Sequence, residues 1–352
     1  MPLLSRMIGA PLAVEIGSGA VASLAPLLAE GRISAGGHVA VAVGPGLGEE
    51  LAAAIRPGLA NAEIWTIEGG SVEAARDLAD RLRGGFFDAV VGIGGGKTLD
   101  TAKHAATLTG LPMVAVATSL AHDGIASPVA SLDDGERKAS YGVQMPIAVM
   151  VDLDYVRRSE PAMRRSGIGD VLSNLGAMAD WRLAGAERGE RIDGLAATFA
   201  HTAAMAILHR TDSIDDDAFL VALAEALVLS GLAMATAGSS RPCSGAEHEI
   251  LHAIDHLFPG TAHHGELAGA ATLFTAHLRA DVAAFGALEH CLGRHGLPKT
   301  HRELGLTDEQ FAQAVVAAPD TRPDRFTVLE QLGLAPEEVA RRVRAFGEAV
   351  DR

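Results

Sequence analysis

The 352-residue chain contains only two cysteines, Cys243 and Cys291, and they show no paired spacing. So few thiols exclude a disulfide framework and a cysteine-based zinc site, and they fit a reducing compartment. Aromatic residues make up only 4% of the sequence, whereas hydrophobic residues in all make up 48%. We therefore expect a cytoplasmic protein whose large core is built from Ala, Val, Leu and Ile.

Positive charge is scarce as well, because 29 Lys and Arg against 44 Asp and Glu give a formal net charge of −15. Such an acidic chain predicts neither nucleic acid nor a membrane as partner, although a local basic pocket for a phosphate remains compatible with it. Asp, Glu, His or Gly interrupt the Ala-rich stretches, so we expect no apolar run long enough to cross a membrane. The N-terminus lacks the features of a signal peptide.

Up to about residue 150, short β-like runs alternate with helix-like segments. The expected strands cover residues 12–15, 38–43, 63–67, 87–93, 113–117 and 147–151. The expected helices between them cover residues 21–29, 49–55, 71–82 and 97–108. Strands separated by helices need crossover connections, which predicts a doubly wound, mostly parallel sheet. The polar segment 133–142 looks like a hairpin or insertion on that sheet.

Strand signals vanish in the second half, which predicts an all-α domain. Its expected helices cover residues 167–184, 191–209, 216–237, 245–257, 265–282, 284–294, 307–318 and 335–350. We therefore divide the chain into an α/β domain, residues 1–158, and a helical domain, residues 159–352.

Three consecutive glycines, Gly94, Gly95 and Gly96, end the strongest strand, and Lys97 follows them. Glycines let the backbone approach a ligand closely, and the N–H groups that open the next helix attract anions. The motif is not a P-loop, since Val91 stands where the first glycine is needed, and Lys97 replaces the third glycine of the dinucleotide fingerprint. A variant phosphate loop is the favoured interpretation, with a tight βα turn as the alternative.

A polar loop begins at Thr118, directly after another expected strand. Ligands of open α/β sheets bind at the carboxyl ends of the strands. Asp123 in this loop could hold substrate hydroxyls, while Thr118, Ser119 and Ser127 could bond a cofactor. An Asx-type turn, with Asp123 bonding its own backbone, explains the loop equally well. The glycine-rich segment 44–48 is a weaker second candidate for a ligand loop.

Five of the fourteen histidines gather in one short stretch, namely His248, His252, His256, His263 and His264. The first three recur every four residues, so on a helix they project from one side. Imidazole is the commonest protein ligand for zinc. The stretch therefore predicts part of a metal site that still needs a carboxylate, with hydrogen-bonded or solvated histidines as the alternative.

Five segments between about residues 87 and 270 resemble the glycerol-1-phosphate dehydrogenase family: GGGKTLDTAKH, TSLAHDGIASP, GIGDVLSNLGAMADW, GAEHEILHAIDH and HHGE. That family lies within a larger group with glycerol dehydrogenase, iron-dependent alcohol dehydrogenases and dehydroquinate synthase. The resemblance implies a dehydroquinate synthase-like fold, NAD or NADP as cofactor, and one divalent metal, usually Zn²⁺, with Ni²⁺ or Fe²⁺ as alternatives.

The activity implied by the resemblance is the interconversion of dihydroxyacetone phosphate and sn-glycerol 1-phosphate. The substrate is then a small phosphorylated polyol or ketone, and we expect a homo-oligomer. Two alternatives stay open: a dehydrogenase of another polyol or cyclitol, and a carbocycle-forming lyase like dehydroquinate synthase. The lyase would use bound NAD only transiently, without net redox change.

The resemblance also assigns roles to single residues. The implied metal ligands are Asp170, His248 and His264, and the implied substrate contacts are Asp123 and His252. The implied cofactor contacts are Gly94, Gly95, Gly96, Lys97, Asp100, Thr118, Ser119 and Ser127. One carboxylate and two imidazoles leave coordination positions open on a metal, and His252 is placed to relay a proton. Without the resemblance, Asp170 would pass for an N-cap or first-turn residue of a helix.

The sequence departs from the family pattern at two points. Ala121 stands where the family usually has a second serine in the loop after Thr118. No acidic residue stands at Gly44, where a carboxylate would favour a free ribose 2′-hydroxyl, so NAD and NADP both remain candidates. The motifs also name no basic residue for the substrate phosphate.

Overall fold

The computed structural model describes residues 11–46, 48–135 and 138–351, which form two compact units. The first unit contains the described residues up to Ser119, together with Gly124–Val156 and Met234–Ser239. The second unit contains Leu120–Asp123, Arg157–Ala233 and the described residues from Ser240 onward. The predicted domain limits, 1–158 and 159–352, stay a prediction.

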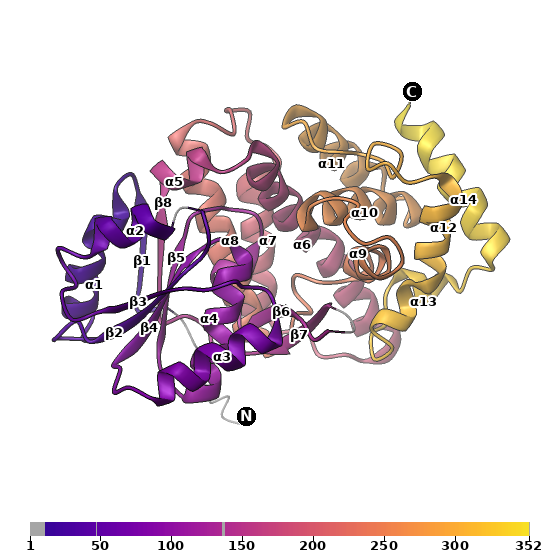
Figure 1. The fold of residues 1–352 in the computed structure, drawn as a ribbon. Helices are drawn as coiled ribbons and strands as arrows, with labels where there is room; N and C mark the ends of the chain where they lie inside the picture. Colours follow the sequence, from indigo (N-terminus) through magenta and orange to yellow (C-terminus); the bar gives the residue numbers. More distant parts are fainter. Residues whose placement is uncertain (1–10, 47, 136–137, 352) are drawn as a thin grey trace, which may run out of the picture. The chain divides into compact units, whose positions relative to one another are not determined.

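Six parallel strands form the sheet of the first unit, in the spatial order β1-β8-β5-β4-β2-β3 (Figure 1). The strands are β1 (Ala13–Gly17), β2 (Val39–Val43), β3 (Glu63–Thr66), β4 (Ala89–Gly94), β5 (Met113–Ala117) and β8 (Ala148–Asp152). The chain runs outward from β2 to β3, returns to β4 on the other side of β2, and then continues to β5. The direction of strand order therefore reverses between β2 and β4.

Helices cover both faces of this sheet. They are a 3₁₀ turn η1 (Ala20–Ser23), α1 (Leu24–Glu30), α2 (Gly48–Ile55), α3 (Val72–Arg83) and α4 (Gly96–Thr109). On one face, Val91 and Ile93 of β4 belong to the same aliphatic core as Leu28 of α1 and Leu51 of α2. On the other face, Gly92 faces α4. The predicted doubly wound sheet is thus confirmed.

A separate two-stranded hairpin also belongs to the first unit. It consists of β6 (Val129–Asp133) and β7 (Lys138–Gly142), which pair antiparallel. Residues 136 and 137 of the predicted hairpin, and residue 47 of the second glycine loop, lie outside the described residues. So does the N-terminal stretch 1–10, on which the signal-peptide expectation rests.

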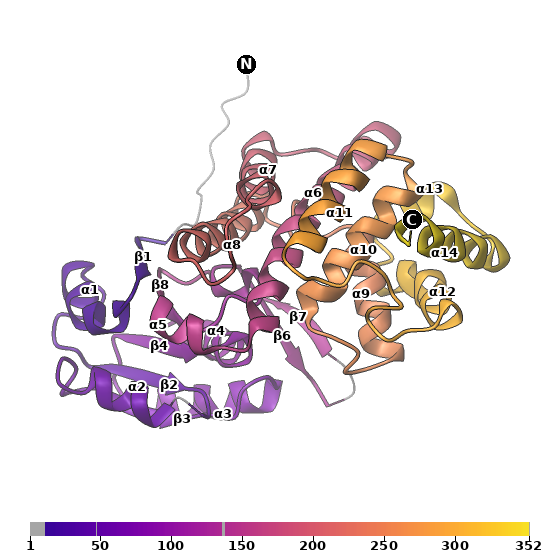
Figure 2. The same ribbon diagram turned by 90° about the horizontal axis from the view of Figure 1, so that it is seen from above.

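The second unit is helical, as predicted, and no strand follows β8 among the residues that the structure describes. After α5 (Leu153–Arg158), which joins the units, its elements are α6 (Pro161–Arg188), α7 (Gly194–Leu208), α8 (Asp217–Ala237), α9 (Ala246–Leu257), α10 (His264–Leu278), α11 (Val282–Arg294), α12 (Asp308–Ala317), a 3₁₀ turn η3 (Ala318–Thr321), α13 (Val328–Leu332) and α14 (Pro336–Val350). Figure 2 shows α6, α9 and α10 side by side, and these three helices contact one another.

Several of the few aromatic residues pack against one another. In the first unit, Trp65 on β3 meets Phe87 edge-on, with ring centroids 5.5 Å apart. In the second unit, Trp181 is buried on α6, and Phe274 packs edge-on against Phe311 and Phe346. Apart from the buried Tyr155 and Phe219, the remaining core is mostly aliphatic, in agreement with the composition.

Helix α8 corrects one expectation. By length and composition it is apolar enough to cross a membrane, with a mean hydropathy of 2.1 over an 18-residue window, because its Asp217 and Glu225 are too few to offset the apolar residues. In the structure, 67% of that window is buried inside the protein. Such burial is typical of the core helix of a globular protein. Length and apolar composition in a single helix are by themselves weak evidence for a membrane span.

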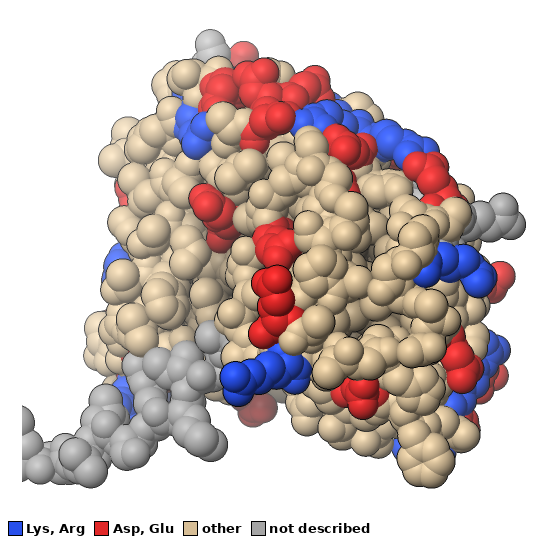
Figure 3. All heavy atoms as spheres, turned by 90° about the vertical axis from the view of Figure 1, so that its left-hand side faces the viewer, with Lys and Arg blue, Asp and Glu red and all other residues tan. Residues whose placement is uncertain are grey.

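The surface shown in Figure 3 reflects the acidic composition. Acidic and basic side chains alternate along its upper rim, and a short column of acidic side chains crosses the middle of the face between wide uncharged areas. This face therefore presents mixed charges at its rim and acidic and neutral groups over most of its middle.

Candidate functional site

Two glycines let helices α6 and α10 approach closely in the second unit. A Cβ atom on Gly169 would lie 1.9 Å from the carbonyl oxygen of Gly265, and one on Gly265 would lie 1.7 Å from the carbonyl oxygen of Ser166. The Ser166 hydroxyl accepts a hydrogen bond of 2.9 Å from the Gly265 N–H. Asp170 and His264 each stand next to one of these glycines, so the helix crossing brings their side chains together.

Asp170, His248 and His264 form a compact cluster, each contributed by a different helix. The Nε2 atoms of His264 and His248 lie 3.5 and 3.9 Å from Oδ1 of Asp170. One potential ligand atom from each residue lies within 4.8 Å of the others. Zinc bonds to nitrogen and oxygen are about 2.0–2.2 Å long, so the donor atoms of a tetrahedral site lie roughly 3.3–3.6 Å apart. The donor set and its spacing fit a divalent cation after small side-chain adjustments.

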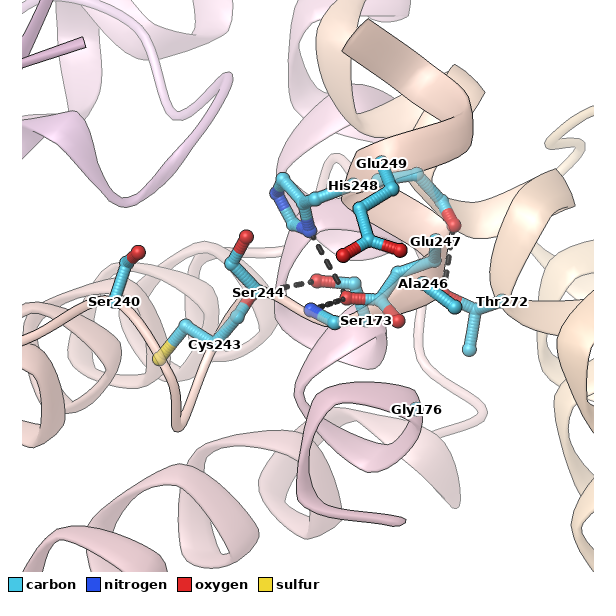
Figure 4. A network of polar contacts seen from close by, with 12 residues as sticks. Ser173, Gly176, Ser240, Cys243, Ser244, Ala246, Glu247, His248, Glu249 and Thr272 are labelled. Atoms are coloured by element: carbon cyan, nitrogen blue, oxygen red, sulfur yellow. Dashed lines mark hydrogen bonds and ion pairs between the residues drawn. The ribbon is translucent and has the colours of Figure 1, made fainter. Parts of the chain in front are cut away.

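Glu247 orients the His248 ring. Its Oε1 lies 3.1 Å from His248 Nδ1 and also accepts a hydrogen bond of 2.5 Å from the Gly245 N–H (Figure 4). This contact leaves Nε2 of the imidazole facing Asp170, as in metal sites where a carboxylate fixes the ligand's tautomer. Space for Glu247 exists because Gly176 and Gly245 have no side chains, and a Cβ on either would lie within 3.0 Å of Oε2.

Negative charge accumulates around the cluster. Burial, reinforced by the charge of Asp123, raises the pKa of Asp170 well above its usual range. Burial alone would also raise the pKa of Glu247, but hydrogen bonding to His248 and attraction by its ring lower that pKa below the ordinary value. Buried carboxylates are stable only when paired or when they coordinate metals. The electrostatics of the cluster therefore favour a bound cation.

The predicted substrate contacts lie next to the cluster. The backbone N–H of Asp123 donates a 2.8 Å hydrogen bond to Oδ2 of Asp170, which ties its loop to α6. His252 follows His248 by one turn of α9, and the two ring centroids are 6.2 Å apart. Sequence reasoning missed His122, whose ring centroid lies 5.9 Å from that of His264. Its position directly before Asp123 was the only available signal.

Sequence reasoning also placed Asp170 wrongly within its helix. Helix α6 begins at Pro161 rather than at residue 167, so Asp170 lies well inside it and is neither an N-cap nor a first-turn residue. Glu266, in contrast, is a capping residue, because its Oε2 accepts a 3.2 Å hydrogen bond from the His263 N–H at the start of α10. Arg322 was missed altogether; its Nη2 lies 3.0 Å from His252 Nε2.

The glycine loop of the first unit joins β4 directly to α4. Gly95 is the N-cap of α4 and provides no side-chain cap, so the first N–H groups of the helix are left for a ligand. The side chain of Thr98 fills the space beside the loop, since a Cβ on Gly94 or Gly44 would lie 2.8 or 2.4 Å from its Oγ1. Gly44 directly follows β2, so both glycine loops meet where the strand order reverses, which is the usual ligand position in such sheets.

The other predicted cofactor residues belong to the same unit. Lys97 is exposed, Ser119 is half-buried beside Gly95, and Thr118 is buried, with its N–H bonded to the Gly94 carbonyl at 3.1 Å. This places the ends of β4 and β5 beside the open helix terminus. The roles of Lys97, Thr118 and Ser119 as cofactor contacts stay predictions.

Asp100 and Ser127 are engaged inside the protein. Asp100 is buried, lies 2.9 Å from Nζ of Lys103 and accepts a hydrogen bond of 3.0 Å from the Ser131 N–H. The Ser127 hydroxyl donates to the Val129 carbonyl at 3.2 Å. Lys103, which sequence reasoning missed, is fully buried and also donates to the Gly124 carbonyl at 2.8 Å. These contacts give both predicted residues a structural role, and cofactor binding by them stays a prediction.

Comparison with solved structures shows the fold. A probable glycerol dehydrogenase from Sinorhizobium meliloti superposes with a TM-score of 0.80 at 21% identity, over 99% of both chains. A sulfoacetaldehyde reductase from Bifidobacterium kashiwanohense, solved with NAD⁺, gives 0.74 at 18% identity, over 97% of this chain and 99% of that chain. The dehydroquinate synthase-like architecture expected from the sequence is thus that of the iron-containing alcohol dehydrogenases and glycerol dehydrogenases.

Comparison with known sequences shows the family. The model described as iron-containing alcohol dehydrogenase matches residues 15–159. Glycerol-1-phosphate dehydrogenase [NAD(P)⁺] from Hyperthermus butylicus is 36% identical over 346 residues, 96% of this chain and 97% of that protein. The protein of the same name from Cenarchaeum symbiosum is 32% identical over 357 aligned positions, 99% of this chain and 98% of that protein. The chain therefore belongs to the glycerol-1-phosphate dehydrogenase family.

Proposed function

We propose that the protein is a metal-dependent, NAD(P)-linked dehydrogenase that interconverts dihydroxyacetone phosphate and sn-glycerol 1-phosphate. The observation that carries this proposal is the cluster of Asp170, His248 and His264, with Asp123 and His252 beside it. Relatives that align over nearly the whole chain bear the name of this activity, which supports it further.

The metal is proposed to be Zn²⁺, with Ni²⁺ or Fe²⁺ as substitutes, because two imidazoles and one carboxylate suit these ions. A divalent cation held by the three residues would polarise the substrate carbonyl. Glu247 keeps the His248 ring in the orientation that this requires. The glycine loop at the start of α4 is proposed to hold the cofactor pyrophosphate through its backbone N–H groups.

Reduction of a ketone consumes one hydride and one proton, and bound NAD(P)H would supply the hydride. The proton must reach the carbonyl oxygen, and His252 is proposed to deliver it. This residue is half-buried on the same side of α9 as His248, one turn further on. A histidine is suited to this role because its ordinary pKa lies near neutrality. Asp123 is proposed to accept a hydrogen bond from a substrate hydroxyl.

The direct test mixes zinc-loaded protein with NADH or NADPH and dihydroxyacetone phosphate, and follows nicotinamide absorbance. We expect the absorbance to fall, the product to be the sn-1 enantiomer by chiral analysis, and a chelator to stop the reaction. No turnover of dihydroxyacetone phosphate with either nicotinamide would overturn the proposal. Release of inorganic phosphate from a sugar phosphate without net NADH change would instead identify a carbocycle-forming lyase.

We also propose that the protein works in the cytoplasm as a homo-oligomer. Both cysteines are free and buried, which suits a reducing compartment. Light scattering on the purified protein tests the assembly, and a monomer at working concentration would contradict it.

A further inference from the structure

Arg322 and Arg325 converge on one serine in the second unit. Their guanidinium groups donate hydrogen bonds of 3.2 and 2.6 Å to the Ser240 hydroxyl oxygen. Arg325 also donates to the backbone carbonyl of Ser244. Both arginines lie in the turn between η3 and α13 and are half-buried, yet neither forms an ion pair with a carboxylate among residues 11–46, 48–135 and 138–351.

A third arginine nearby differs because a carboxylate binds it. Arg241 is held by Glu190 through two hydrogen bonds of 2.8 and 2.5 Å, so its charge is compensated. Burial, together with the charges of Arg322 and Arg241, lowers the pKa of Arg325 to about 10. Arg325 is therefore still charged at neutral pH, and of the three arginines only Arg241 has a carboxylate hydrogen-bonded to it among the residues described. Glu247 and Glu249 attract both other arginines but form no ion pair with them in the described part of the chain. Partly buried charge without a paired counter-ion is costly, so this place favours an anion.

The arginine pair lies beside the proposed catalytic residue. Nη2 of Arg322 is 3.0 Å from His252 Nε2, and His252 follows the proposed metal ligand His248 by one helical turn. In Figure 4 the His248 ring projects from its helix toward the side on which Ser240 and Ser244 lie, and both serine hydroxyl groups point upward in this view. In dihydroxyacetone phosphate, the carbonyl and the phosphate are separated by one methylene and one ester oxygen. His252 thus lies between the proposed metal ligand His248 and Arg322 in a chain of direct neighbours, as the carbonyl and the phosphate of a short substrate would require.

We propose that Arg322 and Arg325, together with the Ser240 hydroxyl, bind the phosphate group of the substrate. Guanidinium groups match phosphate oxygens through paired N–H donors, which a lysine cannot do. Ser240 accepts hydrogen bonds from both arginines, so its own O–H is left to donate to a phosphate oxygen. This inference rests on the proposed function, and it explains how the site distinguishes phosphorylated from unphosphorylated ketones.

A second basic hollow in the same unit is less suitable. Arg165 and Lys299 line a pocket of about 480 Å³, but Glu266 and Glu303 line it too. Lys299 is also 3.4 Å from Glu289. Carboxylates in and beside this pocket compensate its positive charge, so it offers a phosphate less attraction than the arginine pair.

The test compares kcat/KM for dihydroxyacetone phosphate and for dihydroxyacetone in zinc-loaded wild type and single variants. Each charge-assisted bond to phosphate contributes about 1.5–3 kcal/mol, so Arg325→Gln should lower the preference for the phosphorylated ketone roughly 10- to 100-fold. Arg322→Gln should do the same. Because Arg322 also contacts His252, its loss can slow both substrates, so the ratio of the two kcat/KM values is the quantity compared. Arg325→Lys should recover part of the preference.

The matched control is Arg344→Gln, which removes the same charge from an exposed position on α14. It should leave the preference unchanged. Full preference in both Arg322→Gln and Arg325→Gln, or its loss in Arg165→Gln alone, would overturn the inference.

A binding measurement separates this inference from the proposed function. Calorimetric titration of the zinc-loaded protein with inorganic phosphate should show binding that weakens at least tenfold in Arg325→Gln and not in Arg344→Gln. If wild type fails to reduce dihydroxyacetone phosphate, the proposed function is wrong, and the titration still decides the role of the arginines. Equal phosphate binding by wild type and Arg325→Gln would reject that role.

Discussion

The carboxylate of Glu247 holds the imidazole of His248, its neighbour in sequence, with Oε1 and Nδ1 3.1 Å apart. Glu247 is fully buried, and its second carboxylate oxygen has no hydrogen-bond partner among the residues described. A buried carboxylate in this position adds negative charge to the imidazole that it orients. The pair therefore couples the packing of the second unit to the basicity of a proposed metal ligand.

Glu247→Gln should weaken zinc binding about 10- to 100-fold, because the amide keeps the shape of the side chain but removes its charge. Competition with a chromophoric chelator measures the affinity. Glu266→Gln is the matched control, since glutamine can still accept the capping hydrogen bond from His263. Equal zinc affinity in wild type and Glu247→Gln would show that the pair has no influence on the metal.

Asp170→Ala and His264→Ala should each abolish metal retention and activity together. Each removes one of the three donor groups, and two remaining ligands hold zinc poorly. Elemental analysis after dialysis gives the metal content, and the nicotinamide assay gives the rate. A variant that turns over substrate without metal would refute the assignment of the site.

His252→Ala should retain the metal and lose turnover by about 10²- to 10⁴-fold, the usual contribution of a general acid. Metal content and rate are measured on the same sample. A loss of metal equal to that in His248→Ala would mean that the roles of these two histidines have been exchanged.

Gly169→Ala should destabilise the fold, because the new Cβ would lie 1.9 Å from the Gly265 carbonyl oxygen. Overpacking of this kind costs about 1–3 kcal/mol, and the displaced α10 should also bind zinc less well through His264. Urea unfolding with and without zinc measures both effects. Gly286→Ala is the control: it lies within α11 with no atom within 4 Å of the added Cβ, so it should be neutral or slightly stabilising.

Lys103→Met should cost about 3–5 kcal/mol of unfolding free energy, since it leaves Asp100 buried without its cation. Asp100→Asn in the same background should then cost less than it does alone, because the two residues act as a pair. Urea unfolding of the wild type, the two single variants and the double variant gives the interaction free energy between Lys103 and Asp100. Strict additivity would show that the 2.9 Å contact contributes no interaction free energy.

The strands were predictable because their burial is visible in sequence. The strand predicted at 113–117 matches β5. A short apolar run between turn-forming residues is typical of a buried strand, because it is too short for a buried helix. The start of α6 was missed because the polar first turns of a helix carry no apolar periodicity. The helix α13, at five residues, is too short to show a period at all.

The surroundings of the site depend on contacts that no local pattern records. Asp170 meets His264 only because Gly169 and Gly265 permit a close crossing of two helices. Arg322 reaches His252 across 70 residues of sequence, and Arg325 reaches Ser240 across 85. Tertiary packing creates such neighbours, so a single sequence read by spacing gives no signal for them.

The two tryptophans of the chain are divided between the two units, with Trp65 on β3 and Trp181 on α6. Each unit therefore contains its own fluorophore. Replacing either residue by phenylalanine leaves a single emitter that reports on one unit. Trp181 shares α6 with Asp170, so we expect its emission to report on the unit that contains the metal cluster, whereas Trp65 reports on the unit that carries the glycine loop. The chain is thus supplied with two separate optical reporters, one for each half of its proposed chemistry.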